Sequence, residues 1–159
     1  MWARWWLSRY HRLMDGPDAI VIREALPEVV DALVGFDPMA KAGDVTRRTA
    51  IKAWVSAGFT LVAESGADIV GYVATLPRHL FDRDFVAILI VHPSRRHAGV
   101  GRALLNAAVK GAASDRVFTS TNASNAPMKA LLVSSGWLYS GALDGLDPGD
   151  PEEFYYIDR

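Results

Sequence analysis

The chain has 159 residues, half of them hydrophobic, and it contains no cysteine. This length supports one domain with a substantial core, and the lack of cysteine excludes disulfides, thiolate metal sites and a cysteine nucleophile. The 17 basic and 18 acidic residues nearly balance, so the sequence lacks the excess of positive charge typical of nucleic-acid-binding proteins. No apolar run is long enough for a membrane span. We therefore expect a soluble, cytoplasmic protein without a nucleic-acid partner.

The first 18 residues are interpreted as an N-terminal extension, followed by one domain over residues 19–159. Three of the five tryptophans fall within the first six residues, but the apolar run is too short for a signal peptide and no small-residue cleavage site follows. A helix in residues 1–14 would pack on the domain or lie on a membrane surface. The small number of aliphatic side chains favours packing.

The domain alternates strands and helices. Turn residues, helix caps and apolar periodicity predict its first elements. These are a strand at 19–24, a helix at 27–34, a connection at 36–44, a helix capped by Asp44 that ends near 58, and a hairpin of 59–64 with 69–76. The strand predicted at 84–91 is apolar on both faces, so we expect it at the centre of a sheet covered by helices on both sides.

The later elements follow the same alternation. They are a helix at 101–111, a strand at 116–121, a helix at 125–136 and a closing strand pair at 137–142 and 154–157. An acidic loop at 143–153 joins the closing pair. The predicted fold class is therefore α/β.

The junction after the central strand has the pattern of an anion site. Pro93 stops the strand, and Arg96, Gly99 and Gly101 follow in the order Arg-x-x-Gly-x-Gly at the start of a helix. Glycines allow close approach of a ligand, while free N–H groups and the helix dipole favour a pyrophosphate. The dinucleotide fingerprint requires glycine where Arg96 stands, and a P-loop requires a Gly-Lys-Ser/Thr ending that Arg102 breaks. Both of these nucleotide interpretations are therefore disfavoured.

This segment resembles the defining motif of the GNAT (GCN5-related N-acetyltransferase) superfamily, in which Gln/Arg-x-x-Gly-x-Gly/Ala opens a helix after an apolar strand and a proline. A second family segment, Asn-x-x-Ala followed by a short helix and Gly-Phe, is approximated by residues 125–128 and 136–137. The resemblance implies a GNAT fold with a single mixed, mostly antiparallel central sheet, splayed central strands and flanking helices. It also implies an acyl-CoA-dependent N-acyltransferase with acetyl-CoA as co-substrate and no metal.

In the resembling family the helix start holds the pyrophosphate and the central strand lines the pantetheine arm. By this resemblance, the cofactor-binding residues are Leu89, Ile90, Val91, Arg96, His97, Ala98, Gly99, Val100, Gly101, Arg102 and Asn125. The helices between residues 27 and 58 would frame the acceptor, a small-molecule or peptide amine. A homodimer is also common in the family.

The sequence departs from the family at the catalytic residues, because the family's usual leaving-group acid, a tyrosine, is replaced here by Leu132. Tyr139 is the candidate substitute, and Ser134 and Ser135 are further candidates. His92, at the end of the central strand, is the candidate base. Other candidates for the base are His79, Asp82, Asp84 and Glu64.

The preferred hypothesis is transfer of an acetyl group to a primary amine by direct attack in a ternary complex. Two alternatives stay open: a non-catalytic acyl-CoA-binding regulatory module, and a protein-modifying or toxin-type acetyltransferase. The acidic loop would suit a basic acceptor, although its Asp-Pro-Gly-Asp-Pro sequence is equally ordinary turn chemistry.

Overall fold

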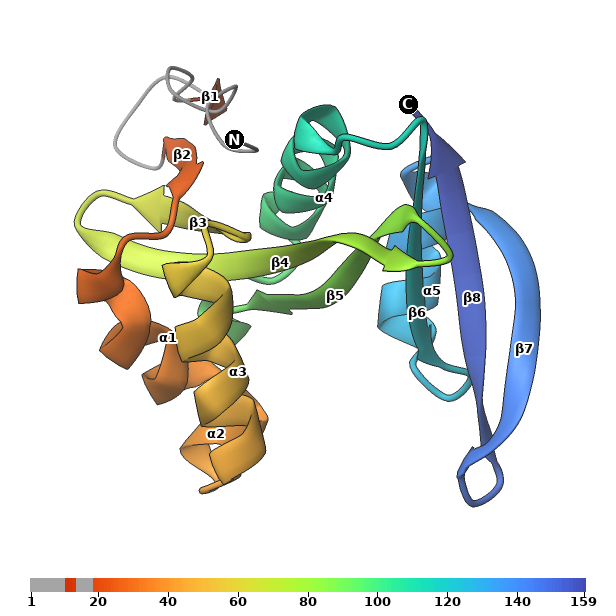
Figure 1. The fold of residues 1–159 in the computed structure, drawn as a ribbon. Coiled ribbons are helices and arrows are strands. Elements are labelled where there is room, and N and C mark those ends of the chain that lie inside the picture. The colour runs from red at the N-terminus through yellow and green to blue at the C-terminus, as the bar shows by residue number, and fades with distance from the viewer. Residues whose placement is uncertain (1–10, 14–18) are drawn as a thin grey trace. The chain divides into compact units, whose positions relative to one another are not determined.

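The computed structural model describes residues 11–13 and 19–159 (Figure 1). The elements in chain order are β1 His11–Leu13, β2 Ile20–Glu24, the 3-10 helix η1 Pro27–Val29, α1 Val30–Phe36, α2 Pro38–Lys41, α3 Val45–Ser56, β3 Thr60–Ser65, β4 Asp68–Leu80, β5 Arg83–Val91, the 3-10 helix η2 Pro93–Arg95, α4 Val100–Gly111, β6 Arg116–Asn122, α5 Ala126–Ser134, β7 Leu138–Asp147 and β8 Asp150–Asp158. They form two compact units: the part of the chain up to Ala74 with Ile88–Gly111, and Thr75–Ala87 with Ala112–Arg159. Strands β4 and β5 contribute to both.

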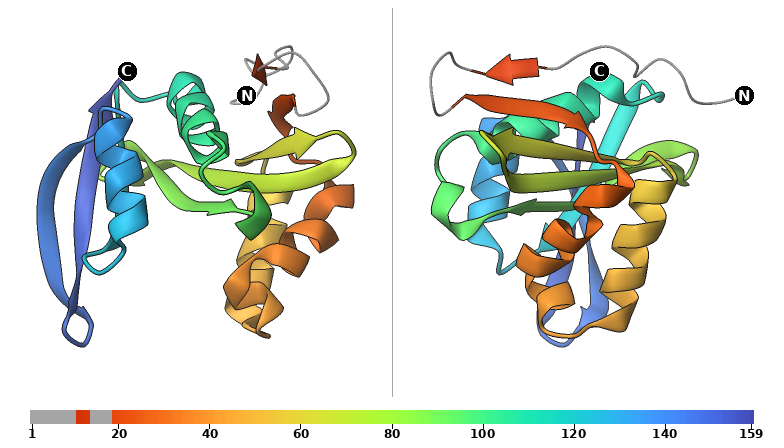
Figure 2. Two further views of the ribbon diagram at one scale, coloured as in Figure 1. Left: turned by 180° about the vertical axis from the view of Figure 1, so that it is seen from behind. Right: turned by 90° about the vertical axis from the view of Figure 1, so that its left-hand side faces the viewer.

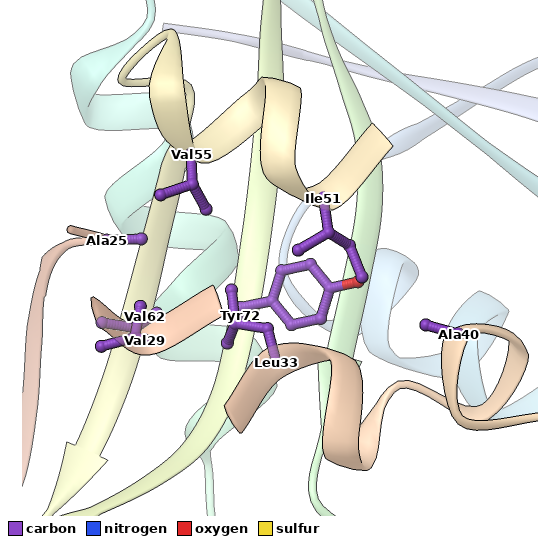
Figure 3. Packing of buried hydrophobic residues seen from close by; sticks show 8 residues of the cluster. All are labelled: Ala25, Val29, Leu33, Ala40, Ile51, Val55, Val62 and Tyr72. Atoms are coloured by element: carbon purple, nitrogen blue, oxygen red, sulfur yellow. The ribbon is translucent and has the colours of Figure 1, made fainter. Parts of the chain in front are cut away.

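In the first unit, hydrogen bonds order the strands β1-β2-β3-β4-β5, with antiparallel pairing from β1 to β4. Helices α1–α3 lie on one face of these strands and α4 on the other (Figure 2). The core beneath α1–α3 is a cluster of eight buried residues (Figure 3), namely Ala25, Val29, Leu33, Ala40, Ile51, Val55, Val62 and Tyr72. Their burial removes apolar surface from water and is the main force holding these helices on the sheet.

Two aspartates begin the helices of this unit. Asp37 accepts hydrogen bonds from the backbone N–H groups of Met39 and Ala40 at the start of α2. Asp44 accepts one from the N–H of Arg47 at the start of α3. Each carboxylate satisfies N–H groups that have no partner within the helix, which is why aspartate is favoured at these positions.

In the second unit, hydrogen bonds order the strands β5-β6-β8-β7. Strand β6 runs parallel to β5 from Asp84–Val117 to Val86–Thr119 and antiparallel to β8. Strand β7 pairs with β8 and lies at the edge. Side chains alternate between buried and half-buried along β6, as expected for a strand with one face against a core.

The predicted mixed, mostly antiparallel sheet with flanking helices is confirmed, and β5 lies between β4 and β6 as its apolar sequence indicated. Two predictions of local structure were wrong. The connection at 36–44 contains α2, because Asp37 caps it and Pro38 fits its first turn. The acidic loop at 143–153 is mostly strand, since β7 and β8 extend to a tight turn. The first strand of that hairpin is exposed on both faces, so it lacks the alternation that marks a strand in sequence.

The N-terminal extension is described only at residues 11–13, which form strand β1 beside β2 rather than part of a helix. The helix expected over residues 1–14 otherwise lies outside the described residues, and the domain boundary at residue 19 stays a prediction. Within the described residues, no helix has the length and apolar character needed to cross a membrane.

Candidate active site

The turn between β5 and α4 combines extended and left-handed residues directly before the start of a helix. After η2, Arg96 is extended, and His97 (φ 63°) and Gly99 (φ 81°) are left-handed. Turns that mix these conformations direct successive N–H groups into an anion-binding concavity. A Cβ on Gly99 would meet no atom within 4 Å, so glycine is required there for its backbone conformation and not for space.

Helix α4 adds its own free N–H groups to this turn. Its first internal hydrogen bond runs from the N–H of Ala103 to the carbonyl of Gly99. The amides of Val100 and Gly101 precede that bond, in the first turn of a helix, where backbone N–H groups have no acceptor within the helix. With the positive end of the helix dipole, they form a site suited to phosphate.

The basic side chains around the turn differ in their contacts and exposure. Arg95 donates from Nη2 to the hydroxyl of Ser65 at the end of β3, 3.1 Å away, so part of its guanidinium is used in fixing the turn to the sheet. Arg96 and His97 are exposed beside the left-handed turn. Arg96 is thus a solvent-exposed arginine within the turn itself.

Gly71 on β4 was not identified from the sequence, yet it determines how closely α4 approaches the sheet. A Cβ on Gly71 would lie 3.0 Å from the carbonyl oxygen of Ile90 and 3.0 Å from Leu104 Cδ1. Any side chain there would push α4 away from β5 and displace the anion site. A glycine inside a strand is a sequence mark of such close approach.

Leu89, Ile90 and Val91 occupy the end of β5 before this turn. The parallel pairs with β6 end at Val86, three residues earlier. On the β4 side, the N–H of His92 donates to the carbonyl of Val70 at 2.8 Å. The strand end is therefore fixed along β4, and the turn begins from a defined position.

His92 shapes the turn through its ring. Its Nδ1 lies 2.8 Å from the hydroxyl of Ser94 and 3.3 Å from the Ser94 backbone N. The ring also packs edge-on to Phe36 of α1, with centroids 6.0 Å apart. These contacts are those of a cap on η2, and the role of His92 as a base stays a prediction.

The other candidates for the base are engaged in local contacts. Asp84 is 2% exposed and accepts the backbone N–H groups of Arg78, Ala113 and Ser114. A carboxylate in that position clamps backbone segments together. Glu64 accepts from Arg23 Nε at 2.8 Å.

The loop candidates are similarly placed. Asp82 lies 3.7 Å from Arg78 Nε in an exposed ion pair. The His79 ring packs against Phe85, with centroids 5.9 Å apart. Neither arrangement marks a proton acceptor for an amine.

The position of the family's usual acid is part of the core, because Leu132 on α5 is fully buried. Tyr139 on β7 is 57% exposed, and its ring stands edge-on to Tyr155 at 5.7 Å. Strands β8 and β6 separate β7 from β5, which at the usual strand spacing places β7 about 14 Å from the β5 residues of the same unit. Tyr139 is thus remote from that part of β5.

Asn125 and the acidic segment at 143–153 make hydrogen bonds that stabilise the local structure. Asn125 caps α5, since its Oδ1 accepts from the N–H of Met128 and its Nδ2 donates to the hydroxyl of Thr121. Three of the hairpin carboxylates also have partners: Asp147 accepts from Asn122, Asp150 from Ser124, and Glu153 from Lys129 and Tyr155. These bonds support a structural role for much of the acidic segment.

No group of three or more potential metal-ligating side chains is found within residues 11–13 and 19–159. The arrangement at the β5–α4 turn instead suits an elongated anionic ligand such as the pyrophosphate of coenzyme A.

Comparisons with known proteins agree with this chemistry. Residues 56–132, which include β5, the turn and α4, match the model of the acetyltransferase (GNAT) domain. No curated protein sequence gives a significant match. An acetyltransferase of the GNAT family from Bacillus cereus is 28% identical and superimposes with a TM-score of 0.82, covering 88% of this chain and 97% of that one.

Two further solved structures share the fold. The Salmonella typhimurium protein yncA, solved with its cofactor acetyl-CoA, is 20% identical with a TM-score of 0.70, over 87% of this chain and 93% of that one. A ribosomal-protein-alanine N-acetyltransferase from Brucella melitensis is 24% identical with a TM-score of 0.71, over 87% of this chain and 99% of that one. These two likenesses show the fold. The match to the acetyltransferase (GNAT) domain and the likeness to the Bacillus cereus protein identify the chain as a GNAT protein and an acyl-CoA-dependent N-acyltransferase.

Proposed function

We propose that this enzyme transfers the acetyl group of acetyl-CoA to a primary amine by direct attack in a ternary complex. The observation that carries the proposal is the turn from Arg96 to Gly101, in which left-handed residues lead directly into the start of α4, the conformation typical of an anion-binding turn. The cofactor-binding residues are those expected from the sequence, residues 89–91, 96–102 and 125. Bound acetyl-CoA supplies an activated thioester. The proposed location is the cytoplasm.

The chain's own groups account for three requirements of amide formation. The amine must be neutral, the thioester carbonyl must be polarised, and the leaving thiolate must receive a proton. A backbone N–H within residues 89–91 polarises the carbonyl. Because the chain lacks cysteine, the amine attacks the thioester directly and no cysteinyl intermediate forms.

For the base we propose His92. The backbone N–H of Ser94 donates to its Nδ1 at 3.3 Å, and the Ser94 hydroxyl lies 2.8 Å from the same nitrogen, so Nδ1 carries the lone pair that would accept a proton from the amine. His92→Gln should lower kcat more strongly at low pH than at high pH, where the free amine predominates in solution. Ser94→Ala should give a smaller decrease with the same pH dependence.

For the leaving thiolate, two proton sources are considered. Tyr139 is the remaining tyrosine candidate, but its edge position favours solvent water as the acid, since the thiol of coenzyme A is acidic enough to leave without a dedicated donor. Tyr139→Phe separates the two. A tenfold decrease in kcat assigns the proton to Tyr139, and an unchanged kcat assigns it to water.

The acceptor is proposed to bind on the side framed by α1, α2 and α3. The solved relatives are named for different acceptors, including a ribosomal-protein alanine and the small molecule nourseothricin, so the shared fold accommodates both peptide and small-molecule amines. Thiol release from acetyl-CoA should therefore be measured with polyamines, amino acids, aminoglycosides and short peptides. Turnover with one class supports the proposal, and absence of turnover with all four refutes it.

A further inference from the structure

Arg47 of α3 has a guanidinium group that the fold uses only in part. Its side chain is 19% exposed, and its buried Nη1 atom has no hydrogen-bond partner among the described residues. The carboxylate oxygen that Nη1 approaches, Asp37 Oδ2, is 3.6 Å away. Buried donors in folded proteins are normally satisfied. An arginine with an unsatisfied buried donor is therefore a candidate for binding a group from outside the chain.

Asp37 is held by three other donors, which explains its distance from Arg47. Its Oδ1 accepts the backbone N–H groups of Met39 and Ala40, and its Oδ2 accepts the Tyr72 hydroxyl at 2.6 Å. The Tyr72 ring lies between α1 and α3, with its hydroxyl on the side of α2 (Figure 3). Asp37 thus attracts Arg47 by charge but makes no direct hydrogen bond with it.

The other terminal nitrogen of Arg47 is covered by a weak acceptor. Arg47 Nη2 lies 3.3 Å from Met39 Sδ, and a thioether sulfur accepts hydrogen bonds poorly. Met39 is 49% exposed, and its side chain has three rotatable bonds. A carboxylate that took the place of this sulfur would form a stronger, charge-assisted hydrogen bond. The thioether of Met39 is therefore a displaceable cover on Nη2.

The segment around Arg47 carries an excess of positive charge. Residues 36–58, which include α2 and α3, contain four basic residues, namely Lys41, Arg47, Arg48 and Lys52. The same segment contains two acidic residues, Asp37 and Asp44, and both accept backbone N–H groups as helix caps. A polyamine would meet charge of its own sign here, whereas a carboxylate would meet opposite charge.

Aromatic contacts connect this region with the end of β5. Phe36 directly precedes Asp37, and its ring stands edge-on to both Tyr72 and His92, with centroids 6.0 Å apart in each pair. His92 follows the last residue of β5, where the amine is proposed to attack the thioester. Two aromatic rings thus lie between Arg47 and the reacting end of the site. A group bound by Arg47 is therefore several bonds away from the reacting amine.

We propose that Arg47 binds a carboxylate of the acceptor and so selects amines that carry a carboxylate several bonds from the amino group. This inference rests on the proposed acetyl transfer and narrows its acceptor class. It favours longer amino acids and short peptides with a free carboxyl end over polyamines and aminoglycosides. On binding, the side chain of Met39 moves away from Nη2, and the guanidinium donates to the carboxylate.

Matched pairs of acceptors test this assignment through thiol release from acetyl-CoA. The pairs are 6-aminohexanoate with hexylamine, and trialanine with its carboxyl-terminal amide. Wild-type enzyme should favour the carboxylate member at least tenfold in kcat/KM, mainly through KM, as expected for a hydrogen bond to a charged group. Arg47→Gln should bring that ratio close to one. Arg48→Gln is the matched control, since Arg48 is exposed and donates to the carbonyl of Ala40, and it should keep the preference.

Met39→Ala provides a readout in the opposite direction. It removes the sulfur from Nη2 and leaves the Met39 backbone N–H to donate to Asp37. KM for 6-aminohexanoate should fall about threefold, because no side chain has to be displaced, and KM for hexylamine should not change. A purely structural Arg47 predicts no difference between the two acceptors. If Arg47→Gln does not fold, Arg47→Lys, which keeps the charge but loses the planar fork, should retain a reduced preference.

The outcomes separate this assignment from the proposed function. Equal kcat/KM within both pairs would overturn the carboxylate site and leave acetyl transfer to amines intact. If none of these amines is acetylated, calorimetry with the acetyl-CoA-bound enzyme decides the question. Binding of 6-aminohexanoate that is tighter than binding of hexylamine, and that Arg47→Gln weakens at least tenfold, supports the site. Equal binding of the two compounds, or no binding of either, would overturn it.

Discussion

The most informative perturbation of the fold is Tyr72→Phe, which removes one hydroxyl from the core of the first unit. That hydroxyl donates to Asp37 Oδ2 at 2.6 Å, and Asp37 is 1% exposed. The remaining group near this oxygen is Arg47 Nη1, at 3.6 Å, which is beyond hydrogen-bonding distance. The variant therefore leaves a buried carboxylate oxygen without a hydrogen bond from a side chain.

The expected loss follows from the charge on the acceptor. A hydrogen bond to a charged group contributes about 1.5–3 kcal/mol to the free energy of unfolding, and the ring stays in place against Phe36. We expect Tyr72→Phe to lose that amount, measured by urea unfolding with tryptophan fluorescence and an unchanged m-value. Tyr139→Phe makes the same chemical change on an exposed ring and should lie within about 0.5 kcal/mol of wild type.

A double-mutant cycle with Asp37→Ala separates the bond from other effects. Asp37→Ala alone should lose about 3–5 kcal/mol, because it removes the cap of α2 and the ion pair between Asp37 and the guanidinium of Arg47. If the hydroxyl acts through Asp37, the loss from Tyr72→Phe should shrink in the Asp37→Ala background by about 1–2 kcal/mol. Equal losses in both backgrounds, or a loss below about 0.5 kcal/mol in the wild type, would refute the reasoning.

The pH dependence supplies an independent check. Burial, and then the hydrogen bond to Asp37, raise the pKa of Tyr72 well above its ordinary 10.0. A group whose folded pKa is raised contributes stability that is fully present below its unfolded pKa and is lost as pH rises above it. The difference in unfolding free energy between wild type and Tyr72→Phe should therefore be constant from about pH 6 to 9 and should shrink above about pH 10.

Three further predictions concern the site and the second unit. The double variant Gly99→Glu, Gly101→Glu should abolish acetyl-CoA binding measured by calorimetry. The added carboxylates would repel phosphate at the helix start, and Gly99 has a left-handed backbone that disfavours a side chain. Retained affinity would overturn the assignment of the cofactor site. Leu132→Tyr, which restores the family's usual residue, should destabilise the protein by about 1–3 kcal/mol through overpacking of a fully buried position, and a gain in thermal stability would contradict this. The side-chain hydrogen bond from Arg116 lowers the pKa of Asp158. The stabilisation from this bond is present above the ordinary carboxyl pKa and is lost as pH falls through the lowered pKa. Arg116→Gln should therefore unfold at a less acidic pH than wild type in acid titrations followed by circular dichroism.

The donor half of the site could be predicted from the sequence because its parts are contiguous. The strand, Pro93, Arg96 and the two glycines occupy 13 consecutive positions from Leu89 to Gly101, and each acts through local backbone geometry. Strand, stop, turn and helix start are all determined by neighbours along the chain. The structure accordingly places left-handed residues and free N–H groups at that segment.

The catalytic assignments had no such local basis. Asp84 was a candidate for the base because it lies in sequence just before the central strand. In the structure its carboxylate accepts the backbone N–H groups of Ala113 and Ser114, which are 29 and 30 positions further along the chain. Tyr139 follows α5 closely in sequence, but the strand order places it at the edge of the sheet. Whether a polar side chain is available for chemistry depends on partners that folding brings from distant segments.

The sequence by itself determined the α/β class, most helix starts and the anion-binding turn, because capping residues, glycines and apolar periodicity act over a few neighbouring residues. Only the tertiary structure decided that Asp37 contacts Tyr72 and Arg47, that Gly71 allows α4 to pack close to β5, and that β7 is an exposed edge strand. These features depend on contacts between residues far apart in the chain, and such contacts form only when the hydrophobic core brings their strands and helices together.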